Sequence, residues 1–465
     1  MTRRGRPDQT EDGEYGREVP FSRVQSRIKG FMNKDWDVLP SVDILKECLR
    51  VLKTGAWALW LMTPRQDSQL EFLLRLRQAG FNISYGSLEW LYLSGFPKAA
   101  DLSLLADKRA CRENLTQKLG REPTKEEFKE AWNKWREKIA VNPNSRLNEG
   151  ENPFTHLAWK AGKNVYETNP HSPEAQALSG SYAGMQLKPA RELIIVSQKP
   201  LAGKTYLDQA LLHLKEPEHN QLGGSYIDDC RIPINKERES DSRVGTDIKR
   251  GYKEGIIKDR EASSYNVSEY GVQMYKDDGR FPANIIVSDN ALDIGIKKKS
   301  AKVDSIGGFG AGLVNYERGY DDSGDLSRYF DLDFWFENKL KELPEEQQKI
   351  FPFLYVPKAS KSERNMGLEM LPNGIHGHGN LGNSNGLERF QTITKNIHPT
   401  VKSLKLMSYL ITLATRENDI VLDPFIGSGT TAISSILLKR RFIGFEREEE
   451  YYKIATERIK YYQKQ

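Results

Sequence analysis

Cysteine, histidine and long apolar runs are all scarce in this chain of 465 residues. Its three cysteines, Cys48, Cys111 and Cys230, have no CxxC spacing, which argues against a disulfide framework or a zinc site and predicts buried free thiols in a reducing cytoplasm. The seven histidines show no ligand spacing, so we expect no metal site. The longest apolar run, residues 56–62, is far below the ~20 residues of a membrane-spanning helix. We therefore expect no membrane partner.

The excess of positive over negative charge is also small. The formal net charge is +5, and 29% of the residues are charged. This mildly basic balance permits a polyanionic partner such as nucleic acid without requiring one. The length is sufficient for two or more domains with a sizeable core.

The N-terminal part of the chain begins with residues 1–30, which lack any periodicity and are interpreted as loop. Helical spacing follows over residues 42–52, and a second amphipathic helix over residues 68–79 stops at Gly80. Between them, residues 56–62 are apolar on both faces, as in a parallel strand covered by helices. Residues 81–93 indicate a further strand or hairpin. This block predicts part of an α/β sheet.

The middle of the chain is less regular. Residues 140–192 and 231–280 are rich in Asn, Ser, Gly and mixed charge, which is typical of loops or mobile insertions. Thr124 and Glu127 form a capping-box pattern that opens a helix. We expect that helix to carry four apolar side chains on one face, namely Phe128, Trp132, Trp135 and Ile139. A short strand is predicted at residues 193–196, and residues 281–287 and 351–365 are interpreted as strand edges that run into polar loops.

The C-terminal third has the clearest pattern. A helix over residues 402–414 precedes the strand DIVLDPF, a glycine turn and a helix that continues through Leu438. The strand RFIGFE and a final helix follow. This order predicts a β-α-β-α half of a doubly wound sheet.

The segment VLDPFIGSGTT carries the main chemical signal. Gly427 and Gly429 provide a tight turn that lets the backbone approach a ligand, and Thr430 and Thr431 open the next helix. Glu446 stands about 20 residues further, where an acidic group accepts hydrogen bonds from ribose hydroxyls. An ordinary glycine turn is the alternative interpretation of GSG alone. No lysine follows the second glycine, which disfavours a triphosphate-binding loop and favours a nucleoside pocket.

The segment DPFIGSGTT, with HPTVKSLKLM before it and FIGFEREEEYYKIA after it, resembles the DNA N4-cytosine/N6-adenine methyltransferases. The resemblance implies the cofactor S-adenosylmethionine. Asp423 and Phe425 would lie beside the cofactor, and Glu446 would hold the ribose. Gly427, Gly429 and Thr430 would surround the methionine end, and Thr431 would also belong to the cofactor site.

The HPTVK element implies a second wall of the same pocket. In the family this element precedes a helix that closes over the methionine carboxylate, and here it supplies His398, Pro399, Thr400 and Lys402. We interpret His398 as pocket lining and not as an acid or base. Ser403 replaces the proline that is usual in the family.

Other segments resemble a phage-associated branch of this family: GFMNKDWD at 30–37, ECLRVLKTGAWALWL at 47–61, SGFPKAADL at 94–102 and SERNMGLE at 362–369. The branch implies a circularly permuted, Rossmann-like methyltransferase sheet, in which the catalytic motif precedes the target-recognition region and the cofactor motif comes last. The corresponding divisions are a lead-in (1–30), an N-terminal methyltransferase part (31–100), an inserted target-recognition region (101–390) and a cofactor-binding part (391–465).

The catalytic tetrad of the family, Asp/Asn/Ser-Pro-Pro-Tyr/Phe/Trp, has no match in this chain. NPF at 152–154 lacks the second proline, and DPF at 423–425 belongs to the cofactor segment. In the family the tetrad lies upstream of the GFMNKDWD-like segment, on a strand beside the DIVLDPF strand. We therefore leave the catalytic residues unassigned and expect that the chain is truncated or that its start codon is misplaced.

The resemblance implies methyl transfer from S-adenosylmethionine to the exocyclic amine of a flipped adenine or cytosine in double-stranded DNA. One alternative is a catalytically inactive remnant that binds DNA or cofactor, and another is methylation of RNA or a small molecule. The long insertion favours a large substrate. Lys188, Lys199 and Arg231 are candidate phosphate contacts, for which solvated surface charges are the competing interpretation.

Overall fold

The computed structural model describes residues 38–92, 99–141, 166–183, 187, 190–233, 275–276, 279–288, 292, 298–299, 303–307, 314–318, 323–324, 327, 330–348, 358–377 and 391–464. The predictions for residues 1–30, for residues 351–357 at the start of the segment 351–365, and for Lys188 lie outside these ranges. At the end of that segment, where a polar loop is predicted, residues 361–365 form a short helix. Most of the two predicted loop segments, 140–192 and 231–280, also lies outside them.

A mixed four-stranded sheet forms one part of the structure. Its order is β1 (Trp57–Met62), β5 (Arg191–Gln198), β2 (Leu88–Leu91) and β8 (Ile285–Val287). β5 runs antiparallel to β1 and to β2, whereas β2 and β8 are parallel. The predicted strand at 56–62 is confirmed, but its paired neighbour is antiparallel and not parallel. Apolar residues on both faces of a strand indicate that both faces are covered. They do not indicate whether the neighbouring strand is parallel or antiparallel.

Helices α2 (Val42–Val51) and α3 (Gln66–Ala79) cover one face of this sheet. Phe72 and Leu76 of α3 pack with Leu193 and Ile195 of β5 in one apolar cluster, which also contains Cys48. Gly80 ends α3 in the left-handed conformation, as predicted, with φ of 102°. Of the predicted strand over 81–93, only residues 88–91 form β2.

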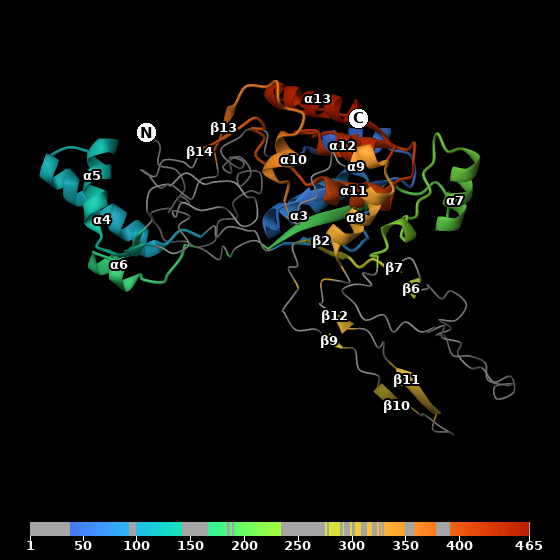
Figure 1. The fold of residues 1–465 in the computed structure, drawn as a ribbon, viewed down its shortest axis with the longest axis horizontal. Coiled ribbons are helices and arrows are strands. Elements are labelled where there is room, and N and C mark those ends of the chain that lie inside the picture. Colours follow the sequence, from blue (N-terminus) through green and yellow to red (C-terminus); the bar gives the residue numbers. More distant parts are fainter. Residues whose placement is uncertain are drawn as a thin grey trace.

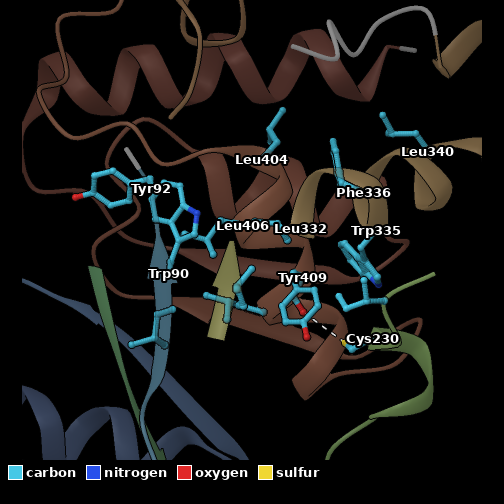
Figure 2. Close-up of a cluster of buried hydrophobic side chains, with 14 of the residues drawn as sticks. Trp90, Tyr92, Cys230, Leu332, Trp335, Phe336, Leu340, Leu404, Leu406 and Tyr409 are labelled. Atoms are coloured by element: carbon cyan, nitrogen blue, oxygen red, sulfur yellow. Dashed lines mark hydrogen bonds between the residues drawn. The ribbon is translucent and has the colours of Figure 1, made fainter. Parts of the chain in front are cut away.

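A second cluster covers the opposite face and joins the sheet to the C-terminal helices (Figure 2). Trp90 of β2 is buried there with Trp335 of α8 (Leu332–Lys341) and Tyr409 of α11 (Leu404–Ala414). The rings of Trp335 and Tyr409 meet edge to face, with centroids 4.9 Å apart. Cys230 lies in the same cluster, and its thiol points at the backbone carbonyl of Tyr409.

The C-terminal residues form the predicted β-α-β-α unit. It consists of β15 (Ile420–Asp423), α12 (Thr430–Leu437), β16 (Arg441–Gly444) and α13 (Glu449–Gln463). β15 and β16 are parallel, with Leu422 opposite Ile443. Helices α11, α12 and α13 lie next to one another (Figure 1). Helix α11 begins at Leu404, two residues later than predicted.

β15 and β1 are both edge strands within the described ranges. β15 pairs only with β16, and β1 pairs only with β5, within the described ranges. Gln221 connects the starts of these two strands, because its N–H donates to the Thr54 carbonyl at 2.8 Å and its side-chain amide donates to Asp419 at 2.9 Å. The free edges of β15 and β1 therefore belong to neighbouring parts of the fold.

A group of helices between residues 101 and 177 stands apart at one end of the molecule (Figure 1). It contains α4 (Leu102–Leu119), α5 (Lys125–Trp135) and α6 (Pro173–Ala177), and Cys111 is buried in it. The predicted capping box of Thr124 and Glu127 is present. The prediction for Ile139 is wrong: α5 ends at Trp135, and Ile139 lies in β3 (Lys138–Val141), where it is 60% exposed. The helix stops where Arg136 turns to pair with the buried Asp107 at 3.0 Å.

The remaining elements are short. They are β4 (Tyr166–Thr168), α7 (Tyr206–Lys215), η2 (Asp228–Cys230), β6 (Tyr275–Lys276), β7 (Gly279–Arg280), β9 (Lys298–Lys299), β10 (Val303–Gly307), β11 (Val314–Arg318), β12 (Ser323–Gly324), α9 (Glu345–Gln348), α10 (Lys361–Asn365), β13 (Gly374–Gly377) and β14 (Gln391–Thr394). Among the helices within the described ranges, none is both long and apolar enough to span a bilayer.

Candidate functional site

The turn between β15 and α12 requires glycine at two positions. Gly427 has φ of 54° and Gly429 has φ of 85°, a region that other residues rarely occupy. A Cβ atom on Gly427 would lie 2.7 Å from the imidazole Nε2 of His398, and one on Gly429 would lie 3.2 Å from the Cα of Ala455. The turn is therefore tight both in its backbone and against its neighbours, as the sequence predicts.

Asp423 fixes the two ends of this turn. Its carboxylate accepts the N–H of Phe425 at 3.0 Å and the hydroxyl of Thr431 at 2.5 Å. Burial raises the pKa of Asp423, while both hydrogen bonds oppose that shift. The ring of Phe425 is 53% exposed beside the turn, so it offers an apolar surface to a ligand.

Glu446 lies next to the turn, as its position after β16 predicts. One carboxylate oxygen accepts the N–H of Gly427 at 2.9 Å, and the other accepts the N–H of Glu448 at 2.8 Å. A carboxylate oxygen has two lone-pair sites, so each oxygen of Glu446 keeps an acceptor site after these bonds. The arrangement is compatible with a hydroxyl-bearing ligand.

The HPTVK segment forms the opposite wall. His398 is buried, and its ring packs edge to face against Tyr451 of α13 with centroids 4.6 Å apart. Its Nδ1 accepts the N–H of Thr400 at 3.3 Å, so that nitrogen has a partner within the segment. Thr430 donates to the carbonyl of Lys402 at 3.3 Å. The structure thus brings the two predicted segments into direct contact.

The other residues of this segment differ in their exposure. Pro399 is half-buried, and Thr400 is exposed. The ammonium of Lys402 pairs with Glu192 of β5 at 2.7 Å, so it ties the segment to the four-stranded sheet. Ser403 is the N-cap of α11, and its hydroxyl accepts the N–H of Leu406 at 3.4 Å. A capping serine explains how the chain starts this helix without the proline that is usual in the family.

Two candidate phosphate contacts have structural partners instead. The ammonium of Lys199 donates to the carbonyls of Arg50 and Leu52 at the end of α2. The guanidinium of Arg231 is buried and pairs with Asp228 at 2.8 Å. The burial of Arg231 contradicts a surface phosphate contact there, whereas Lys199 is half-buried and its phosphate contact stays a prediction.

One residue of the site was not predicted. Arg458 of α13 is fully buried, and its guanidinium donates to the backbone carbonyl of Ser428 between the two glycines. The sequence does contain a signal, because Arg458 continues the spacing of the buried Tyr451, Ile454 and Ala455. A charged residue on the apolar stripe of a helix indicates a buried polar partner.

Comparison with known proteins gives a family match and several relatives that match over a short segment. The model of a family described as DNA methylase matches residues 40–457. Type II methyltransferase M2.DpnII of Streptococcus pneumoniae is 50% identical over 62 residues, 13% of this chain and 23% of that protein. Type II methyltransferase M.HindIII of Haemophilus influenzae is 46% identical over 82 residues, 17% of this chain and 26% of that protein.

Among solved structures, the M1.HpyAVI–SAM complex is 55% identical over 13% of this chain and 30% of that chain, with a TM-score of 0.13. The chain spans about a quarter of the length of the curated relatives it matches.

Proposed function

This chain belongs to the DNA methylase family, and on that premise we propose that it binds S-adenosylmethionine and methylates the exocyclic amine of adenine or cytosine in double-stranded DNA. The observation that carries the proposal is the convergence of three segments distant in sequence. His398 meets Gly427, Lys402 meets Thr430, and Glu446 accepts the N–H of Gly427. A site of this kind also suits a cytoplasmic enzyme whose three cysteines are free thiols.

The residues present fit this cofactor. The exposed Phe425 ring provides a surface for the adenine, and the acceptor sites of Glu446 suit the two ribose hydroxyls. The N-terminus of α12 follows the glycine turn, where unpaired N–H groups favour the methionine carboxylate. When bound, the cofactor supplies an electrophilic methyl group on a sulfonium. The chain's own part is to fix its position and orientation.

We place the acceptor side of the site at the free edge of β15. Methyl transfer to an amine needs a hydrogen-bond acceptor for the amino group and an aromatic that stacks on the flipped base. A strand inserted between the free edges of β15 and β1 would join the two sheets and would end beside Asp423. Such a strand is the position we propose for the tetrad that the sequence lacks. This strand order would give the permuted, Rossmann-like sheet.

The residues between the two methyltransferase parts, 101–390, are proposed to recognise the DNA target. A binding protein without transferase activity is the second candidate function, and the missing tetrad favours it. It would keep the cofactor site and lose the acceptor site. The two candidate functions differ in one measurable step, the transfer of the methyl group to DNA.

The experiment combines calorimetric titration of S-adenosylmethionine with transfer of a radiolabelled methyl group to unmethylated DNA. The chain is compared with a version carrying an added N-terminal strand and an Asp-Pro-Pro-Tyr tetrad. We expect both to bind the cofactor and only the extended chain to transfer methyl groups. Transfer by neither, with binding intact, would favour the binding protein, whereas absence of binding in both would refute the cofactor site.

A further inference from the structure

Arg458 reaches the glycine turn from the side of α13. Its side chain is fully buried, and Nη1 donates to the carbonyl of Ser428 at 2.6 Å and to the hydroxyl of Ser428 at 3.1 Å. Ser428 lies between Gly427 and Gly429, the two residues with the greatest backbone freedom in the turn. One cation therefore fixes the peptide that connects them.

The same guanidinium is linked to α10. Its Nη2 donates to the carbonyl of Glu363 at 3.4 Å. The carboxylate of Glu363 accepts the N–H of Leu404, the first residue of α11, at 2.7 Å. Burial raises the pKa of Glu363, and the neighbouring Arg458 opposes that shift. This network joins α10, α11 and α13 behind the turn.

Helix α10 also holds the opposite wall of the site. Arg364 donates to the carbonyl of His398 at 2.8 Å. Asn396 donates twice to this helix: its backbone N–H donates to the side chain of Asn365 at 2.9 Å, and its side-chain amide donates to the carbonyl of Arg364 at 2.7 Å. The glycine turn and the HPTVK segment are therefore both fixed to the same short helix.

A buried arginine is costly to maintain for packing alone. Burial lowers the pKa of Arg458, and an apolar side chain of similar volume would fill the same space without that penalty. Its charge instead acts on the backbone of the turn and lies within 3.5 Å of the Thr430 hydroxyl at the start of α12. The geometry is that of a residue that shapes the turn before a ligand arrives.

We propose that Arg458 is a positioning residue for the cofactor: it locks the Ser428 peptide and so holds the glycine turn in its binding conformation. This inference rests on the proposed function, since it concerns the same cofactor. Without Arg458 the turn keeps its two glycines but loses the bonds that restrict them, and part of the binding energy is then spent on ordering the turn.

The test uses the full chain with Arg458→Met, which keeps the volume without donors, and Arg458→Lys, which keeps the charge. Arg447→Met is the matched control, because Arg447 is an exposed arginine that pairs only locally with Glu448. We expect calorimetric affinity for S-adenosylmethionine to fall roughly 10- to 100-fold in Arg458→Met, less in Arg458→Lys, and not in Arg447→Met. Binding by Arg458→Met at the affinity of the unaltered chain would overturn the proposal.

Hydrogen exchange separates positioning from a general loss of structure. Arg458→Met should speed exchange at residues 426–430 in the ligand-free chain and leave α11 protected. If Arg458→Met does not fold, Arg458→Lys carries the test, and affinity within twofold of the unaltered chain overturns the inference. If the unaltered chain itself binds no cofactor, the proposed function fails. The exchange measurement then still decides whether Arg458 orders the turn.

Discussion

The two faces of the C-terminal β-α-β-α unit are buried to very different extents. On the helical side, Ile433 of α12 is fully buried in the large core cluster. On the other face, Ile420 and Ile443 are 45% and 49% exposed, and Phe445 after β16 is 60% exposed. Parallel strands are normally covered on both faces. The comparison shows that the helical side is complete, whereas the outer face and the edge of β15 present apolar surface for which the described residues provide no cover.

The largest expected effect contrasts two isoleucines of this unit. Ile433→Ala should lower the free energy of unfolding by about 2–5 kcal/mol, because it leaves a cavity in a packed core. Ile443→Ala should change it by less than about 0.5 kcal/mol, because that side chain lies on the open face. Urea unfolding of the two variants measures the difference. A similar loss in both would mean that the outer face is covered in this chain.

The second prediction concerns the glycine turn between β15 and α12, on the buried helical side of the unit. Gly427→Ala places a Cβ atom 2.7 Å from His398 and forces alanine into the left-handed region, which costs about 1–2 kcal/mol before any clash. We expect at least a roughly 10-fold loss of affinity for S-adenosylmethionine by calorimetry.

Gly120→Ala is the matched control for this substitution. Gly120 has φ of 67° but open space where the Cβ would lie. The Gly120→Ala variant therefore has the backbone strain without the steric clash. It should lose stability in α4 and keep cofactor affinity. Equal affinity of Gly427→Ala and the unaltered chain would show that the turn does not form the binding surface.

The smallest expected effect is a pH dependence of the free energy of unfolding, caused by Asp423 at the end of β15. Because burial raises the pKa of Asp423, the folded chain holds this proton to higher pH than the unfolded chain does. The contribution to stability is fully present below ~3.9, the pKa of an unperturbed aspartate, and is lost as pH rises through the folded value. Asp423→Asn should flatten this decline in urea unfolding between pH 4 and 7. An unchanged slope would assign the decline to other groups.

Local chemistry explains what the sequence predicts well. The turn at Gly427 and Gly429, the capping box at Thr124 and the stop of α3 at Gly80 each depend on a few adjacent residues. The direction of β1's neighbour was predicted wrongly because that neighbour, β5, begins more than a hundred residues later in the chain. Such pairing leaves no trace in the alternation of apolar residues.

The candidate site shows the same division. Its front, from Asp423 to Thr431 and at Glu446, is contiguous or regularly spaced, so pattern and resemblance predicted it together. Its back depends on Glu363 and Arg458, which lie 95 positions apart and meet only when α10 and α13 pack. In the sequence, this contact is indicated only by the position of Arg458, a charged residue on the apolar stripe of α13.

The three buried thiols are distributed so that each reports on a different part of the molecule. Cys48 is part of α2 and packs in the cluster between α2, α3 and β5, Cys111 lies in the α4–α6 helical group, and Cys230 lies in the core shared with α11. Burial raises the pKa of all three thiols, so alkylation is slow until the surrounding part opens. Time-resolved alkylation read by mass spectrometry would therefore follow the opening of three regions in a single experiment, without any introduced label.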